Sequence, residues 1–255
     1  CINPVWRPDG QMIAYERTDH DAADESGLES TRVWLLDLAQ QPSVTTPLFS
    51  DPHIFGESPQ WSADGRRLAL YDRDSASILI YDFLENASVR VPTPAGTSGA
   101  LAPDGRSLIF PEVILEEGRD ARTSLQLADL TTTSIHALPG TSDAASDEDA
   151  RWSPDGASII VRRRYLDSRY TQGYQLAQID LATGNVRDLT NEPRFTHGFF
   201  AWNATGEQLV VQRLSLFDDR GQPDTLASPQ IWTYDLATGE FTFVADNAFY
   251  PRWVP

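Results

Sequence analysis

The sequence predicts an all-β fold in which short four-stranded antiparallel sheets repeat along the chain, a β-propeller. A hairpin motif and a strand motif alternate five times through the 255 residues. No segment shows the periodicity of about 3.6 residues that an amphipathic helix requires. Repeating units that hold four strands each are typical of propeller blades.

The first motif of each unit predicts a hairpin. Its five copies run from Trp6 to Gly10, Trp61 to Gly65, Leu101 to Gly105, Trp152 to Gly156 and Trp202 to Gly206, each followed by a β-rich run. In a Pro-Asp-Gly turn, proline presets φ, aspartate accepts hydrogen bonds from the nearby backbone, and glycine takes positive φ. Each copy therefore predicts the first two strands of a blade.

The second motif predicts the third strand of each blade. It is an apolar run that ends in Asp37-Leu38, Asp82-Phe83, Asp129-Leu130, Asp180-Leu181 or Asp235-Leu236. After the last two copies, Gly184 and Gly239 mark a further turn, and β-rich segments follow at 186–190 and 241–244. These segments predict the fourth strands.

The motifs divide the chain, taken as one domain over 1–255, into blades. The predicted blades span 4–50, 59–93, 99–140, 150–190 and 199–247, and 249–255 looks like the first strand of a sixth. Because first-strand sequences stand at both ends, the sequence favours a segment of a propeller with six or more blades. A five-bladed propeller is the alternative.

The motifs resemble the WD40-like (PD40) repeat of the TolB and tricorn propeller families. Trp152-Ser153-Pro154-Asp155-Gly156 matches the repeat without a change, whereas Leu101 replaces its tryptophan in the third unit. The resemblance covers nearly the whole chain and implies the propeller fold. Through TolB it implies a bacterial periplasmic or other extracytoplasmic location and a docked partner, with a cytoplasmic location left open. The fold hosts many roles, so the resemblance does not fix one.

Composition and charge limit the kinds of partner that the chain can be expected to bind. A formal charge of -17 repels phosphate backbones, so we expect no nucleic-acid partner. No apolar run is long enough to span a membrane. Cys1 is the only cysteine, which leaves no internal disulfide and has two interpretations: the lipidated terminus of a bacterial lipoprotein, or a cut from a longer chain. We expect a monomer.

The predicted connectors differ between the two ends of each blade. Those joining the first to the second strand, and the third to the fourth, are short turns. The other connectors, on what we call the loop rim, take the insertions: 18–31, 112–123, 163–173 and 214–229 between second and third strands, and 49–57, 140–149 and 190–198 between blades. Length variation on one side of a rigid scaffold is typical of a binding face.

Charged residues recur seven positions after each hairpin glycine, where the second strand approaches the loop rim. They are Arg17, Asp72, Glu112, Arg163 and Arg213. Arginine can hold a ligand carboxylate through two parallel hydrogen bonds, so these residues form a candidate ligand site. The alternative is that they pair with one another between neighbouring blades.

Sequence motifs for catalysis are missing. The chain holds no G-x-S-x-G, no H-E-x-x-H and no phosphate-binding loop, so no catalytic residue, metal or cofactor is predicted. His197 falls in a predicted loop of the rim, where it could reach a ligand. Glu57 and Glu148 are the carboxylates that a carbohydrate-active propeller enzyme would use as its pair.

Three hypotheses follow from the sequence. The leading one is a non-catalytic scaffold that binds a protein or peptide through the loop rim. The alternative is the substrate-gating propeller of a prolyl-oligopeptidase-like or tricorn-like serine peptidase. A carbohydrate-active enzyme is the third.

Overall fold

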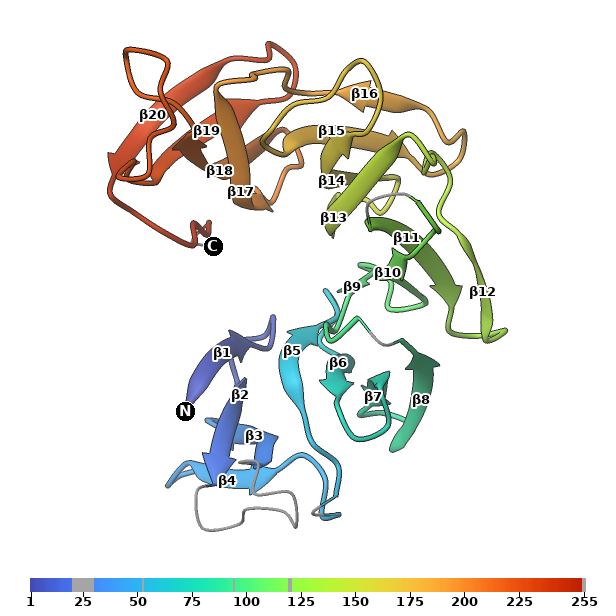
Figure 1. The fold of residues 1–255 in the computed structure, drawn as a ribbon. Coiled ribbons are helices and arrows are strands. Elements are labelled where there is room, and N and C mark those ends of the chain that lie inside the picture. The colour runs from blue at the N-terminus through green and yellow to red at the C-terminus, as the bar shows by residue number, and fades with distance from the viewer. Residues whose placement is uncertain (20–29, 52, 94, 119–120, 254–255) are drawn as a thin grey trace. The chain divides into compact units, whose positions relative to one another are not determined.

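The chain folds as an all-β propeller of four-stranded antiparallel sheets (Figure 1), as the sequence predicts, and it has five blades, which was the alternative to the favoured prediction of six or more. The computed structural model describes residues 1–19, 30–51, 53–93, 95–118 and 121–253. In every sheet the four strands pair in chain order. The chain divides into two compact units, one of residues 1–112 and 126–136 and the other of 113–125 and 137–255.

Within the residues that the structure describes, the five sheets contain twenty strands. The first holds β1 (Ile2–Trp6), β2 (Met12–Asp19), β3 (Ser30–Asp37) and β4 (Val44–Pro47), and the second β5 (Glu57–Trp61), β6 (Arg67–Asp72), β7 (Ser77–Asp82) and β8 (Ala87–Pro92). The third holds β9 (Ala100–Leu101), β10 (Ser107–Ile114), β11 (Arg122–Asp129) and β12 (Ser134–Ala137). The fourth holds β13 (Ala145–Trp152), β14 (Ser158–Tyr165), β15 (Gln175–Asp180) and β16 (Val186–Asp188), and the fifth β17 (Phe195–Trp202), β18 (Gln208–Ser215), β19 (Gln230–Asp235) and β20 (Phe241–Asp246).

The two middle strands of a sheet carry its core. β6 and β7 are buried at almost every position, because both faces of these strands are covered. The fourth strands are more open, and every residue of β16 is exposed. Short apolar runs in the sequence therefore mark the middle strands, and polar runs mark the outer ones.

The hairpin turns form through the predicted side-chain capping. At the second hairpin, the Asp64 carboxylate accepts hydrogen bonds from the backbone N–H of Arg66 (2.9 Å) and the hydroxyl of Ser62 (2.6 Å), and Gly65 has a φ of 68°. The fifth hairpin lacks the aspartate. There the Asn203 side-chain oxygen accepts from the backbone of Glu207 (3.0 Å) and Gln208 (3.2 Å), so an amide fills the same role.

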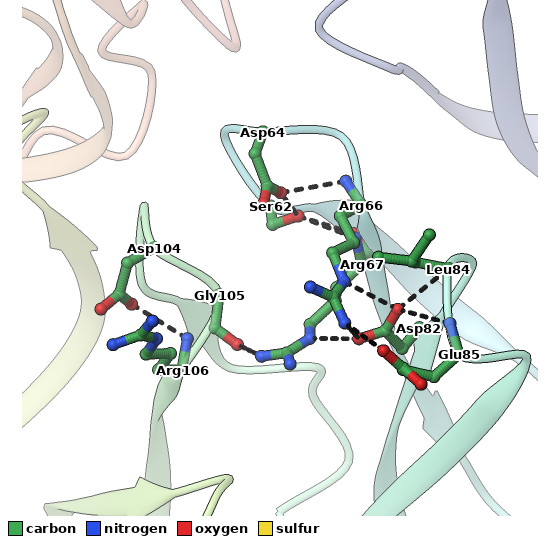
Figure 2. Close-up of polar contacts among 10 residues, drawn as sticks. All are labelled: Ser62, Asp64, Arg66, Arg67, Asp82, Leu84, Glu85, Asp104, Gly105 and Arg106. Atoms are coloured by element: carbon green, nitrogen blue, oxygen red, sulfur yellow. Dashed lines mark hydrogen bonds and ion pairs between the residues drawn. The ribbon is translucent and has the colours of Figure 1, made fainter.

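Asp82, which ends β7, joins two turns of the second sheet (Figure 2). Its carboxylate accepts hydrogen bonds from the backbone of Leu84 (3.0 Å) and Glu85 (3.2 Å), which caps the turn to the fourth strand. It also accepts from the guanidinium groups of Arg66 (2.9 Å) and Arg67 (3.0 Å) of the hairpin turn. Partial burial works against ionisation, but these hydrogen bonds hold the pKa of Asp82 well below its usual value.

Arg67 extends the same network to the next sheet. Its guanidinium group donates a hydrogen bond to the backbone oxygen of Gly105, in the hairpin turn of the third sheet (Figure 2). The two hairpin turns are therefore tied together by one arginine that Asp82 positions.

Two predicted loops of the rim are wrong in extent. β13 begins at Ala145 and β17 at Phe195, so Glu148 and His197 lie in strands and not in the loops 140–149 and 190–198. Both strands continue across a β-bulge, with a register shift between Glu148 and Arg151 in β13. A bulge interrupts the alternation of side chains, which is why the sequence pattern begins these strands too late, after the bulge.

Residues 249–253 form no strand, although the sequence suggests a further first strand there. Trp253 nevertheless donates a hydrogen bond from its indole N–H to the backbone oxygen of Ala201 (3.1 Å). Trp61 makes the same bond to Val5 of the first sheet (3.2 Å). Ala201 and Val5 each directly precede the first-strand tryptophan of their own sheet.

The backbone near Tyr250 repeats a second feature of a first strand. Tyr250 has a φ of 53°, as Ser58 of β5 does, three residues before the tryptophan in both cases. The N–H of Tyr250 donates to the side chain of Gln212 (3.1 Å), and that of Ser58 donates to the side chain of Glu16 (2.7 Å). Residues 249–253 therefore contact the fifth sheet as a first strand contacts the sheet before it.

Candidate functional site

Arg17 and Glu112 are exposed, and each contacts one residue of its own sheet. The guanidinium carbon of Arg17 lies 4.5 Å from the centre of the Trp34 ring, which is a cation–π contact. The Glu112 carboxylate accepts a hydrogen bond from the Gln126 amide (2.7 Å). Both charged groups are therefore accessible to solvent.

Asp72 is buried, with 2% of its surface exposed. One carboxylate oxygen accepts hydrogen bonds from Ser75 (2.6 Å) and Arg90 (3.2 Å), and the other has no partner. These contacts lie within the second sheet and its tight 73–76 turn, so Asp72 closes that turn.

Arg163 and Asp147 form a buried ion pair on β14 and β13. Two nitrogens of the Arg163 guanidinium donate to the two Asp147 oxygens (2.6 and 2.7 Å), and one of them also donates to the backbone oxygen of Gly140 (2.9 Å). The side chains are 3% and 2% exposed. The pair connects β13, β14 and Gly140, and because its charges compensate each other inside the fold, it has no exposed group left to offer a ligand.

Arg213 of β18 lies among aromatic rings. Its guanidinium carbon is 3.6 Å from the centre of the Phe195 ring, 5.0 Å from that of Phe241 and 5.3 Å from that of Trp232. The side chain is 10% exposed and pairs with Glu192. The aromatic faces and one carboxylate together hold this charge inside the fifth sheet.

His197 is fully buried and faces two oxygens. Its Nδ1 lies 3.2 Å from the backbone oxygen of Tyr174, and its Nε2 lies 3.2 Å from the Glu192 carboxylate, which also pairs with Arg213. Burial raises the pKa of Glu192, but the hydrogen bond from His197 and the charge of Arg213 outweigh burial and lower that pKa. His197 therefore fixes the 189–194 segment through Glu192.

Glu148 belongs to a group of contacts with Tyr174 and Arg162. Its carboxylate accepts hydrogen bonds from the Tyr174 hydroxyl (2.5 Å) and from Arg162 (3.2 Å), and Arg162 also donates to Asp149 (2.7 Å). The guanidinium carbons of Arg162 and Arg164 both lie over the Tyr174 ring, 4.6 and 5.2 Å from its centre. Burial, and then the hydrogen bond to Glu148, raise the pKa of Tyr174.

Glu57 is held by Arg73 in the second sheet. Glu57 and Glu148 lie in different compact units, and each carboxylate is paired with an arginine of its own sheet. A role for the two as a catalytic pair stays a prediction.

No ion pair of the described residues joins two of the five residues that follow the hairpin glycines. Their charged groups contact Trp34, Arg90, Gln126, Asp147 and Glu192 instead. Within each compact unit these residues therefore do not pair with one another, and both their pairing between neighbouring blades of different units and their binding of a ligand stay predictions.

Tyr174 and Glu192 were not predicted. Tyr174 directly follows a predicted loop, and Glu192 lies inside another, at positions that no motif marks. An arginine on a neighbouring strand could have indicated both residues. A partly buried arginine requires a hydrogen-bond acceptor or an aromatic face, and these two residues supply them.

No group of three or more His, Cys, Asp or Glu side chains among the described residues could hold a metal ion. No helix in that part of the chain has the length and apolarity needed to span a bilayer. The thiol of Cys1 is free and exposed.

No protein-family model matches the chain. A curated relative is the "Uncharacterized peptidase YuxL" of Bacillus subtilis (strain 168), 26% identical over 233 residues. The match covers 87% of this chain and 31% of that protein, so the chain spans about a third of the length of this relative.

Solved structures match over nearly the whole chain. TolB from Acinetobacter baumannii has a TM-score of 0.62 and 16% identity, covering 93% of this chain and 53% of that one. The fold is TolB-like. The β-propeller domain of the Trilobed protease from Pyrococcus furiosus has a TM-score of 0.68 and 15% identity, covering 95% and 68%. At these identities the two structures establish the fold alone.

Proposed function

We propose that this propeller is the non-catalytic, substrate-gating domain of a serine peptidase of the prolyl-oligopeptidase-like or tricorn-like class. The observation that carries the proposal is the match to the peptidase YuxL, which runs along 87% of this chain and 31% of that protein. The 255 residues hold no G-x-S-x-G motif, so the nucleophile of such an enzyme would lie in another part of the polypeptide.

A gating role is supported by the difference between the hairpin turns, which are fixed by hydrogen bonds, and the connectors of the loop rim, which vary in length. The hairpin turns are held by their own side chains, as at Asp64 and Asn203. The connectors between second and third strands range from 73–76 to 216–229. Connectors of unequal length on rigid sheets are typical of a binding face, and a domain that selects substrates requires such a face.

The test compares two proteins: this 255-residue chain and the complete polypeptide that carries it. We expect the complete polypeptide to react with a fluorophosphonate probe for activated serines and to hydrolyse short peptides faster than folded proteins. The 255-residue chain should do neither. Replacing 216–229 by a short turn should reduce the difference in hydrolysis rate between short peptides and folded proteins.

Two results would contradict the proposal. One is a complete polypeptide that neither reacts with the probe nor cleaves any peptide. The other is peptide cleavage by the 255-residue chain alone.

A second candidate is a binding scaffold, supported by the TM-score of 0.62 to TolB over 93% of this chain. In this proposal the loop rim docks a protein or peptide partner in the cell envelope, and Cys1 is the lipid anchor. Purified partner would be captured by the chain and released when 216–229 is shortened. Equal capture by both forms would remove the loop rim from this proposal.

A further inference from the structure

Three consecutive arginines on β14 differ in how their charges are compensated. Arg162 donates to Asp149 (2.7 Å) and Glu148 (3.2 Å), and Arg163 forms the buried pair with Asp147. Arg164, next in the strand, has no hydrogen-bond acceptor and no carboxylate partner in the described part of the chain.

This makes Arg164 different from every comparable arginine. Of the arginines that the structure describes as partly or fully buried, all others donate to a carboxylate or to a backbone oxygen. The Nε of Arg164 is buried with no partner. A buried N–H without an acceptor is costly, because it has lost water and gained no hydrogen bond in return. The residue as a whole is only partly buried, so a ligand can still reach its guanidinium group.

The guanidinium group of Arg164 is nevertheless held in place. It lies over the Tyr174 ring, 5.2 Å from the ring centre, and the Tyr174 hydroxyl is fixed by its hydrogen bond to Glu148 (2.5 Å). A stacked guanidinium loses little further side-chain entropy when it binds an anion. An oriented donor without an acceptor is what an anion site requires.

We propose that Arg164, stacked on Tyr174, binds the carboxylate of a peptide. A single guanidinium matches a single carboxylate through two parallel hydrogen bonds. The net charge of -17 disfavours polyanions with several phosphates. This inference rests on the gating function proposed above, because that function is the reason to expect a peptide as the ligand. It adds that the carboxylate is the group of the peptide that the propeller binds. The carboxylate can come from the C-terminus of a peptide or from an acidic side chain.

Isothermal titration calorimetry of the 255-residue chain with three acetylated peptides tests the proposal. The first is tetra-alanine with a free C-terminal carboxylate, the second is its C-terminal amide, and the third is the amide with one alanine replaced by glutamate. We expect binding of the first or third peptide and at least about tenfold weaker binding of the second. The peptide that binds identifies the source of the carboxylate.

Variants then assign the contact. Arg164→Gln should weaken carboxylate binding by about 10- to 100-fold, since it removes a charge-assisted hydrogen bond. Arg164→Lys should retain part of the affinity, because lysine keeps the charge without the planar fork. Arg106→Gln removes one positive charge from an exposed turn residue and should bind as the wild type does. An unchanged near-ultraviolet circular dichroism spectrum shows that each variant is folded.

The proposal is overturned if the three peptides bind equally, if none of them binds, or if folded Arg164→Gln binds as the wild type does. These outcomes are separate from those for the gating function. A complete polypeptide that cleaves peptides while Arg164→Gln has no effect removes only the carboxylate site. Binding of carboxylates without any peptidase activity of the complete polypeptide removes only the gating function.

Discussion

The two ends of each sheet are built differently. At the hairpin end, a side-chain oxygen caps the turn in both the second and the fifth sheet. Asp64 accepts from the N–H two residues on, and Asn203, at the position of Ser62, accepts from the N–H groups four and five residues on. At the loop rim, the residue seven positions after the hairpin glycine contacts an aromatic ring at Arg17, an amide at Glu112 and a buried carboxylate at Arg163. The hairpin end, which repeats from sheet to sheet, therefore specifies the fold. The loop rim differs from sheet to sheet, so a function that belongs to one sheet alone is expected there.

The largest expected effect is at the loop rim, at Asp147. Asp147→Ala leaves the buried guanidinium of Arg163 without its carboxylate, so we expect a loss of about 3–5 kcal/mol in the free energy of unfolding. Urea unfolding followed by tryptophan fluorescence measures it.

A matched control is Asp143→Ala. Asp143 also pairs with an arginine, Arg122 (2.6 Å), but its side chain is 79% exposed. A solvated pair of this kind contributes less than about 1 kcal/mol. Equal losses for Asp143→Ala and Asp147→Ala would mean that burial does not set the strength of the pairs at this end.

The next effect is at the hairpin end, at Asp82. Asp82→Ala removes the acceptor of two backbone N–H groups and two guanidinium groups, and we expect a loss of about 2 kcal/mol in the free energy of unfolding. Asp235→Ala is the matched variant, because Asp235 caps the equivalent turn of the fifth sheet at the N–H of Ala237 (3.0 Å) and of Thr238 (2.9 Å) and accepts from the Thr238 hydroxyl (3.2 Å) in place of the arginines. A smaller loss for Asp235→Ala shows that Arg66 and Arg67 contribute more than that hydroxyl. Equal losses would show that the arginines contribute no more than it does.

The same residue gives the hairpin end a dependence on pH. The pKa of Asp82 is lower in the folded chain than in the unfolded one, so its contribution is complete above the unfolded pKa of about 3.9. The contribution declines as pH falls from there towards the folded pKa. We expect Asp82→Ala and the wild type to differ in melting temperature at pH 7 and to approach each other below about pH 3. A difference that stays constant down to acid pH would contradict the assignment.

The hairpin end was predictable because its interactions are local in sequence. The Asp64 carboxylate accepts hydrogen bonds from the Ser62 hydroxyl, within the motif, and from the backbone N–H of Arg66, directly after it. For the loop rim, the sequence predicted where the long connectors lie but not which side chains contact one another there. Arg163 of β14 contacts Asp147 of β13, sixteen residues away, and Arg213 of β18 contacts Glu192, which precedes β17 and is twenty-one residues away. Both β13 and β17 contain a bulge. A bulge shifts the pairing register, and the alternation of side chains in the sequence does not continue across it. The sequence therefore predicts a loop at His197, although this residue lies in β17.

The smallest effect tests how the hairpin end tolerates a changed motif. Asn203→Ala removes the oxygen that accepts from Glu207 and Gln208, and we expect a loss of about 1 kcal/mol in the free energy of unfolding. Asn203→Asp keeps an acceptor at the same position and should change stability by less than about 0.5 kcal/mol. Urea unfolding of both variants measures the two values. Similar losses for the two would mean that the amide N–H₂ of Asn203, and not its oxygen, holds the fifth turn, and the shared capping scheme would then end at the fourth sheet.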